Sequence, residues 1–144
     1  MDKVGRILLV GLISGLVLNY YFKLIEWLTG DKVYTLLLNV DYIPVLKNYT
    51  FPEWIEISFH MIVSFVLAFI YAWLWNRWKK PFLYTVLTAL VIGMVIYPTT
   101  GFSDRTPEVT DLSALFWWQT GHLLYGWVVA WMLQRLYNKN KTGG

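Results

Sequence analysis

The hydrophobic pattern of this chain is dominated by four long, nearly uninterrupted apolar stretches. They run over residues 7–22, 55–75, 82–97 and 112–133. A bilayer core is about 30 Å thick and a helix rises about 1.5 Å per residue, so one span needs about 20 apolar residues. The second and fourth stretches meet that length, whereas the first and third need flanking residues or local thinning of the bilayer. The pattern predicts an all-α, integral membrane four-helix bundle that occupies residues 1–144 as a single membrane domain. The expected spans are at about 5–24, 54–76, 81–98 and 112–136.

The long connection between the first two stretches carries a periodic pattern of its own. Val33, Leu36, Leu37 and Val40 repeat with a helical period, and Asp31 stands where it can cap the first turn. We therefore expect a short amphipathic segment that lies on the outer surface of the bilayer.

Charged residues are segregated between the connections, which predicts an orientation. The two termini and the 76–81 connection hold eight basic residues and one acidic residue, whereas the 23–56 and 98–111 connections hold four basic and eight acidic residues. Basic residues concentrate on the cytoplasmic side of membrane proteins. Both termini are therefore predicted to be cytoplasmic, and the net charge of +3 reflects topology rather than nucleic-acid binding.

The composition argues against several function classes. Because 57% of the residues are hydrophobic, the four spans use nearly the whole chain and leave no segment for a separate soluble catalytic domain. The chain has no cysteine, which excludes a disulfide framework, a thiolate zinc site and a cysteine nucleophile. It also lacks the HExxH and GxSxG motifs and a glycine-rich phosphate loop. We therefore expect a protein that is not an enzyme and that holds no cofactor.

Each predicted span has one stripe of small or polar residues on an otherwise apolar surface. Small residues let helix backbones approach closely in lipid, so these stripes are expected to face inward as packing seams. The expected helix-packing residues are Gly11, Gly15, Ala68, Gly93 and Gly126.

Polar side chains on the same stripes are the candidates for chemistry. His60 and His122 are the two ionisable side chains expected inside the hydrocarbon layer, about 8 and 15 Å below its outer end. Ionisable groups at such depth usually face a bundle interior or a wet cavity. The predicted polar seam consists of His60, His122, Glu56, Ser64, Gln119 and Asn19.

The sequence leaves three roles open for this seam. In a structural role, neutral imidazoles hydrogen bond across the helices, with Ser64, Gln119 or Asn19 as partners. In a proton-linked role, the imidazoles change charge near physiological pH and Glu56, one turn above His60, tunes that change. In a metal-binding role, Glu56 joins the two histidines as a third ligand, but no tight ligand motif is present and no metal is expected.

Four runs of the sequence form a recognisable set: residues 60–64 with Ala68 and Tyr71, residues 97–101 (Tyr-Pro-Thr-Thr-Gly), residues 121–123 (Gly-His-Leu), and residues 11–15 with Glu26. These runs resemble the YagU family of bacterial inner-membrane proteins. The resemblance implies a bacterial cytoplasmic-membrane location and an association with survival in acid, and both histidines match the family pattern. The first outer connection departs from that pattern, because it is shorter and lacks a Pro-Pro-Arg element.

These observations together predict a non-enzymatic, multi-pass protein of the bacterial inner membrane that supports acid or envelope stress tolerance through the polar seam. Two alternatives remain. One is a small oligomeric transporter or channel, and the other is an assembly subunit that binds a membrane-protein partner. In every case the lipid bilayer is the expected surrounding, a homo-oligomer is an option, and no nucleic acid is involved.

Overall fold

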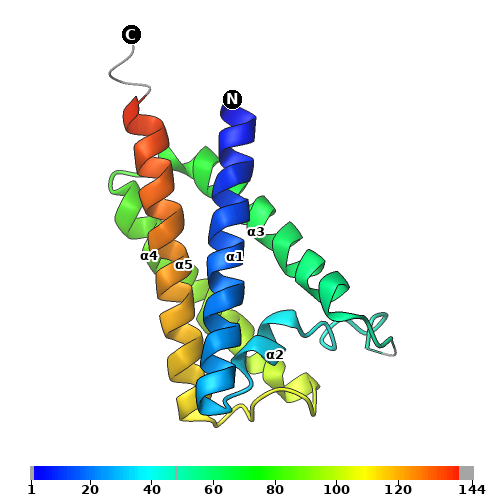
Figure 1. The fold of residues 1–144 in the computed structure, drawn as a ribbon. Coiled ribbons are helices and arrows are strands. Elements are labelled where there is room, and N and C mark those ends of the chain that lie inside the picture. Colours follow the sequence, from blue (N-terminus) through cyan, green and yellow to red (C-terminus); the bar gives the residue numbers. More distant parts are fainter. Residues whose placement is uncertain (1, 48, 140–144) are drawn as a thin grey trace.

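The computed structural model describes residues 2–47 and 49–139, and this part of the chain is helical without any strand (Figure 1). The elements are α1 (Lys3–Thr29), α2 (Val33–Leu38), α3 (Glu53–Trp75), α4 (Pro81–Ile96), the 3-10 helix η1 (Tyr97–Phe102) and α5 (Leu112–Lys139). The prediction of an all-α protein is confirmed.

Three helical segments are long and apolar enough to cross a membrane. They are Lys3–Thr29, Glu53–Trp75 and Pro81–Phe102, the last of which joins α4 to η1. α5 has 28 residues but is not among them, because polar residues interrupt it along its length. The expected fourth span therefore stays a prediction.

The helix ends depart from the expected bounds at two places. α1 continues to Thr29 and ends at Gly30, whose φ of 81° lies in the left-handed region that glycine adopts readily. α4 ends at Ile96, and the Tyr97–Phe102 segment that contains Pro98 continues as a 3-10 helix. α5 begins with a side-chain cap, since the Asp111 Oδ1 accepts from the Ala114 N–H at 3.0 Å.

The short helix α2 is present, but its predicted cap is wrong. Lys32 occupies the N-cap position and makes no side-chain cap hydrogen bond. Glu26 of α1 serves the first turn instead, because its carboxylate accepts from the Thr35 N–H at 2.8 Å and from the Thr35 hydroxyl at 2.7 Å. Asp31 is engaged elsewhere and accepts from the Ser113 hydroxyl at 2.7 Å. A carboxylate from the preceding helix thus replaces the local cap, and it also ties α2 to the end of α1.

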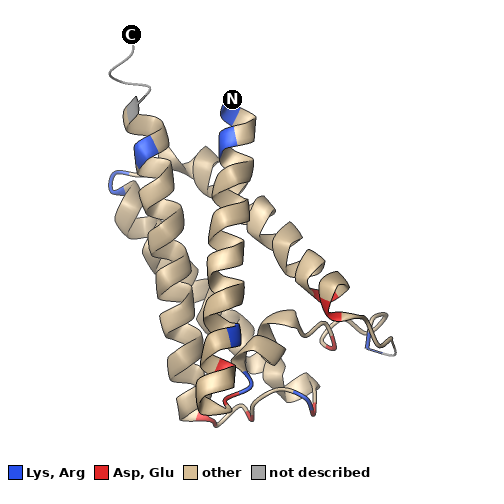
Figure 2. Ribbon diagram, in the orientation of Figure 1, with Lys and Arg blue, Asp and Glu red and all other residues tan. Residues whose placement is uncertain are grey.

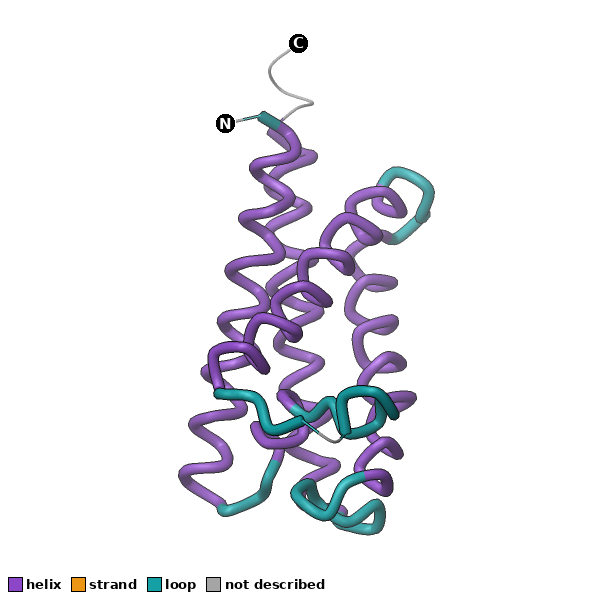
Figure 3. The backbone as a smooth tube through the Cα atoms, turned by 90° about the vertical axis from the view of Figure 1, so that its right-hand side faces the viewer, coloured by secondary structure: helices purple, strands orange, loops and turns teal. Residues whose placement is uncertain are grey.

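The long helices do not pack as a closed ring. α4 packs along α5, α5 along α1, and α1 along α3. α3 and α4 follow one another in the chain, yet they meet mainly near the 76–80 connection and diverge toward the end that carries α2 and η1 (Figures 1 and 3). This arrangement leaves a gap between α3 and α4 with α1 and α5 behind it.

The predicted small residues lie where helices approach most closely. A Cβ added at Gly126 of α5 would lie 2.7 Å from the Ala89 Cβ of α4, and one added at Gly11 of α1 would lie 3.0 Å from the Phe65 Cα of α3. Both contacts are too short for a real side chain, so the bare backbone is needed at each crossing. Ala68 is fully buried.

The two ends of the molecule carry opposite charge. The beginning of α1 and the end of α5 lie at one end of the fold (Figure 1). Figure 2 shows basic residues at that end, and acidic residues gathered, with a few basic ones among them, at the opposite end around α2 and the connections to α3 and α5. The separation that the sequence predicts along the chain is therefore also a separation in space.

Candidate functional site

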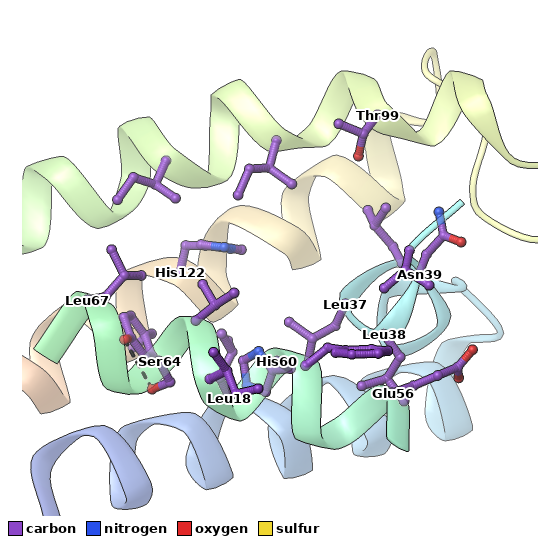
Figure 4. A pocket seen from close by; sticks show the side chains of 18 of the residues that line it. Leu18, Leu37, Leu38, Asn39, Glu56, His60, Ser64, Leu67, Thr99 and His122 are labelled. Carbon is purple, nitrogen blue, oxygen red and sulfur yellow. Dashed lines mark hydrogen bonds between the residues drawn. The ribbon is translucent and has the colours of Figure 1, made fainter. Parts of the chain in front are cut away.

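The gap between α3 and α4 forms a cavity of about 300 Å³, which we call the α3–α4 cleft (Figure 4). α1 and α5 form its floor, and α2 with the segment that follows it covers one end. Most of its walls are aliphatic, with Leu18, Leu37, Leu67 and Ile92 contributed by four different helices. Four residues of the predicted polar seam line the cleft, namely His60, His122, Ser64 and Glu56.

His60 is held by the backbone of α1. Its Nε2 lies 3.1 Å from the Gly15 carbonyl oxygen. A carbonyl can only accept, so Nε2 carries the proton and Nδ1 is the acceptor nitrogen of the neutral ring. Within the described residues Nδ1 has no hydrogen-bond partner. The close approach of α1 to α3 at Gly15, where an added Cβ would lie 2.9 Å from the Met61 sulfur, brings the carbonyl within reach of the ring.

His122 is held by its own helix and by tight packing. Its Nδ1 lies 2.8 Å from the Trp118 carbonyl oxygen, so Nδ1 donates and Nε2 is the acceptor nitrogen, which has no hydrogen-bond partner in the described part of the chain. The ring centroid lies 4.6 Å from that of Trp118. Gly93 of α4 provides the space on the other side, because a Cβ there would lie 2.7 Å from the His122 Cγ. The side chain is 7% exposed, and its position depends on a glycine from a neighbouring helix.

Ser64 joins three helices at the bottom of the cleft. Its hydroxyl donates to the Gly11 carbonyl oxygen of α1 at 2.8 Å. Because that uses its single proton, the contact of 3.2 Å with the Tyr125 hydroxyl of α5 has Tyr125 as the donor. The predicted role of Ser64 as a histidine partner is not what the structure shows, since both imidazoles bond to backbone carbonyls.

A polar cluster lies at the end of the cleft near α2. The Arg105 guanidinium lies 3.4 Å from an Asp41 carboxylate oxygen and 3.6 Å from a Glu56 carboxylate oxygen. Arg105 also contacts the Asn39 Oδ1 at 3.4 Å. The partner that the structure gives Glu56 is thus Arg105, and no hydrogen bond joins Glu56 to His60 in the described part of the chain. The tuning of His60 by Glu56 stays a prediction.

Two residues of the predicted seam lie outside the cleft. Asn19 is buried at 4% exposure on α1, and its Oδ1 has no hydrogen-bond partner among the described residues. The Gln119 side chain lies against α4, and once its amide oxygen and nitrogen are exchanged, the nitrogen donates to the Leu90 carbonyl oxygen at 3.2 Å and the oxygen accepts from the Met94 N–H at 3.0 Å. The polar stripes on α1 and α5 therefore include residues that do not line the cleft.

The structure adds lining residues that the sequence reasoning did not select. Among them are three polar residues: Asn39 at the end of α2, Thr99 of η1 and Tyr125 of α5. Tyr125 stands one turn after His122, so the helical period could have identified it. Asn39 and Thr99 come from a short helix and a 3-10 turn, and no periodic signal connects them to the histidines.

The residues that line the cleft do not form a metal-binding set. Among the described residues, no three His, Cys, Asp or Glu side chains gather closely enough to hold a metal ion. The cleft instead presents hydrogen-bond donors and acceptors that are surrounded by apolar side chains.

Comparisons with family models, curated proteins and solved structures found no match to this chain. The resemblance to the YagU family therefore stays a prediction.

Proposed function

We propose that this chain is a non-enzymatic, four-span protein of the bacterial inner membrane with both termini in the cytoplasm. Three segments have the length and hydropathy of membrane spans. α5 has 28 residues, about 42 Å at the usual helical rise, and it packs between α1 and α4. The basic end of the fold, which carries both termini, supports a cytoplasmic position for that end.

We further propose that the α3–α4 cleft changes its charge with external pH and that this supports acid tolerance. The single observation that carries the proposal is that His60 and His122 line one cleft and each keeps one ring nitrogen without a partner in the described structure. Each free nitrogen can take up a proton while the other nitrogen keeps its bond to a carbonyl. The pKa of an unperturbed imidazole, about 6.5, lies in the mildly acidic range.

Protonation would change the cleft physically. Two positive rings in a mostly aliphatic cavity need water or counter-charge, because burying an unpaired charge is strongly unfavourable. The cleft therefore widens or hydrates in acid. The separation of α3 and α4 is what changes, because these two helices contact each other sparsely, whereas α3 packs firmly on α1 and α4 on α5.

A distance measurement across the cleft tests this proposal. The chain has no native cysteine, so spin labels can be placed at Val66 of α3 and Val91 of α4, which are 52% and 60% exposed on the outer helix faces. We expect the distance between the labels to lengthen between pH 7 and pH 5. In the double variant His60→Gln, His122→Gln, which keeps a donor at each position, we expect no lengthening.

The same double variant is then compared with the unmodified chain for survival of cells at low external pH. An unchanged distance in the unmodified chain, or equal acid survival of the two strains, overturns the acid-linked function.

The orientation is tested separately with an impermeant maleimide on intact cells. Val45→Cys lies in the segment after α2, where Val45 is 74% exposed, and it should react at once. Lys79→Cys, at an exposed position of the 76–80 connection, should react only after the cells have been permeabilised. The reverse pattern overturns the predicted topology.

A further inference from the structure

The α3–α4 cleft opens sideways, toward the surroundings of the helices. Ile62 and Val63 of α3 line the cleft and are nevertheless 57% and 51% exposed. The cleft therefore has a rim on the outer helix surface, which faces lipid if the long helices span a bilayer. A molecule from the bilayer can enter it without crossing the protein.

The shape of the cleft suits one hydrocarbon chain. On α3 the lining runs from Glu56 to Tyr71, about 22 Å at the helical rise. The volume of about 300 Å³ is small for that length, so the space is narrow. Aliphatic cavities of this kind exclude water and accept apolar ligands.

Two unsatisfied polar side chains mark one end of this cleft. Asn39 is 3% exposed, and its Oδ1 is occupied by the Asp41 N–H at 3.2 Å and by Arg105. Its Nδ2 has no partner among the described residues, and the same is true of the Thr99 Oγ1. Figure 4 shows the two side chains on opposite sides of the same end of the cleft. Buried donors without acceptors are unfavourable, so an oxygen atom placed between them would be stabilised.

The charged residues beside these two donors indicate which kind of polar head group an apolar-chain ligand of the cleft can carry. Asp41 and Glu56 supply two carboxylates and Arg105 supplies one guanidinium, so the cluster already contains an excess of negative charge. An anionic head would be repelled there. A neutral head with a carbonyl or hydroxyl oxygen could accept from Asn39 and Thr99 without that penalty.

We propose that the α3–α4 cleft binds a neutral amphiphile with a single hydrocarbon chain. Its head oxygen accepts from the Asn39 Nδ2 and the Thr99 hydroxyl, and its chain runs along α3 past His60 and His122. This inference rests on the proposed function in one respect, namely that the long helices lie in a bilayer. It does not depend on a response to pH.

The proposal is tested by photolabelling the full chain in nanodiscs with a monoacylglycerol that carries a diazirine in its acyl chain. We expect crosslinks on peptides of α3, α4 and α5 that line the cleft, and displacement by unlabelled monoacylglycerol. A fatty acid with the same diazirine chain, ionised at the working pH, should label the cleft at least threefold less, as expected for unfavourable charge at the head (about 0.7 kcal/mol or more).

Matched variants separate the site from general lipid contact. Thr99→Val should weaken competitive binding by about 3- to 10-fold, the effect of one lost hydrogen bond. Thr100→Val is the control, because Thr100 also has a buried hydroxyl in η1 without a partner among the residues that the structure describes, but it does not line the cleft. Ile92→Trp should fill the cleft and abolish displaceable labelling, whereas Val91→Trp, on the outer face of α4, should not.

Three results would overturn the proposal: equal effects of the two threonine variants, displaceable labelling that survives Ile92→Trp, or fatty-acid labelling as strong as that of monoacylglycerol. Circular dichroism of each variant confirms that it is folded. The cysteine-accessibility and spin-label measurements use no added amphiphile, so they still decide the proposed function if this ligand fails to bind.

Discussion

Replacing Gly93 with alanine is the sharpest perturbation of the site, because it adds one methyl group directly against His122. The new Cβ would lie 2.7 Å from the His122 Cγ and 3.0 Å from its Nδ1. The ring cannot retreat freely, since Trp118 stands 4.6 Å away on the same helix. The substitution therefore has to displace the imidazole or push α4 away from α5.

Three contributions set the magnitude, of which two are destabilising and one is stabilising. Overpacking of this kind costs about 1–3 kcal/mol, and loss of the 2.8 Å bond from His122 to the Trp118 carbonyl adds about 0.5–1.5 kcal/mol. Alanine in place of glycine within a helix returns about 0.5–1 kcal/mol. We expect Gly93→Ala to lower the free energy of unfolding by about 1–3 kcal/mol.

A double-mutant cycle with His122→Ala isolates the contact. Without the imidazole the added methyl group meets empty space, so Gly93→Ala should become neutral or slightly stabilising in that background. Unfolding is followed in detergent micelles by far-UV circular dichroism. Gly126→Ala serves as the control, because its Cβ would meet Ala89 and Val86, and its effect should be the same with or without the imidazole. If Gly93→Ala costs the same free energy in both backgrounds, the assigned packing of His122 is wrong.

Two further predictions concern other hydrogen bonds of the fold. Ser64→Ala removes the acceptor of the buried Tyr125 hydroxyl and should lower the free energy of unfolding by about 1–3 kcal/mol, whereas Ser58→Ala, at an exposed position whose hydroxyl bonds within its own helix, should change it by less than about 0.5 kcal/mol. Burial, and then the 2.6 Å bond that the Tyr34 hydroxyl donates to Glu53, raise the pKa of Tyr34; its contribution is therefore present below about pH 10 and is lost as the pH rises further. Tyr34→Phe should flatten the alkaline decline of unfolding free energy measured between pH 8 and pH 11, and an unchanged decline would refute this assignment.

The candidate site was predictable in part, and the part that failed has a physical reason. His60, Ser64 and His122 stand on helical stripes, which a periodic reading of one helix at a time identifies. Arg105 pairs with Asp41, 64 positions earlier in the chain, and no local pattern reports such a pair. Most polar lining residues of the long helices were therefore predictable, with Tyr125 as an exception, whereas those that the connections bring to the end of the cleft were not.

The hydrogen-bond partners of the two imidazoles could not be predicted from the sequence either. Both imidazoles bond to backbone carbonyls, whereas side-chain partners were expected. Every helical residue has a carbonyl, so residue type does not reveal the acceptor: His122 uses the carbonyl four residues earlier in its own helix, and the acceptor of His60 depends on how closely α1 approaches α3. At Gly15 that approach is set by a neighbouring helix.

The sequence by itself determined which segments are helical, that several of them suit a bilayer, and that opposite charges gather at opposite ends. These properties depend on apolar length and on the order of residues, which are local quantities. Only the tertiary structure decided that α3 packs on α1 and leaves α4, its neighbour in the chain, to form an open cleft. The helices are apolar nearly all round, so hydrophobicity does not choose between faces. The shape of the helix surfaces decides which helices pack together. The absence of a side chain lets α3 approach α1 closely at Gly11, and lets α4 approach α5 closely at Gly126.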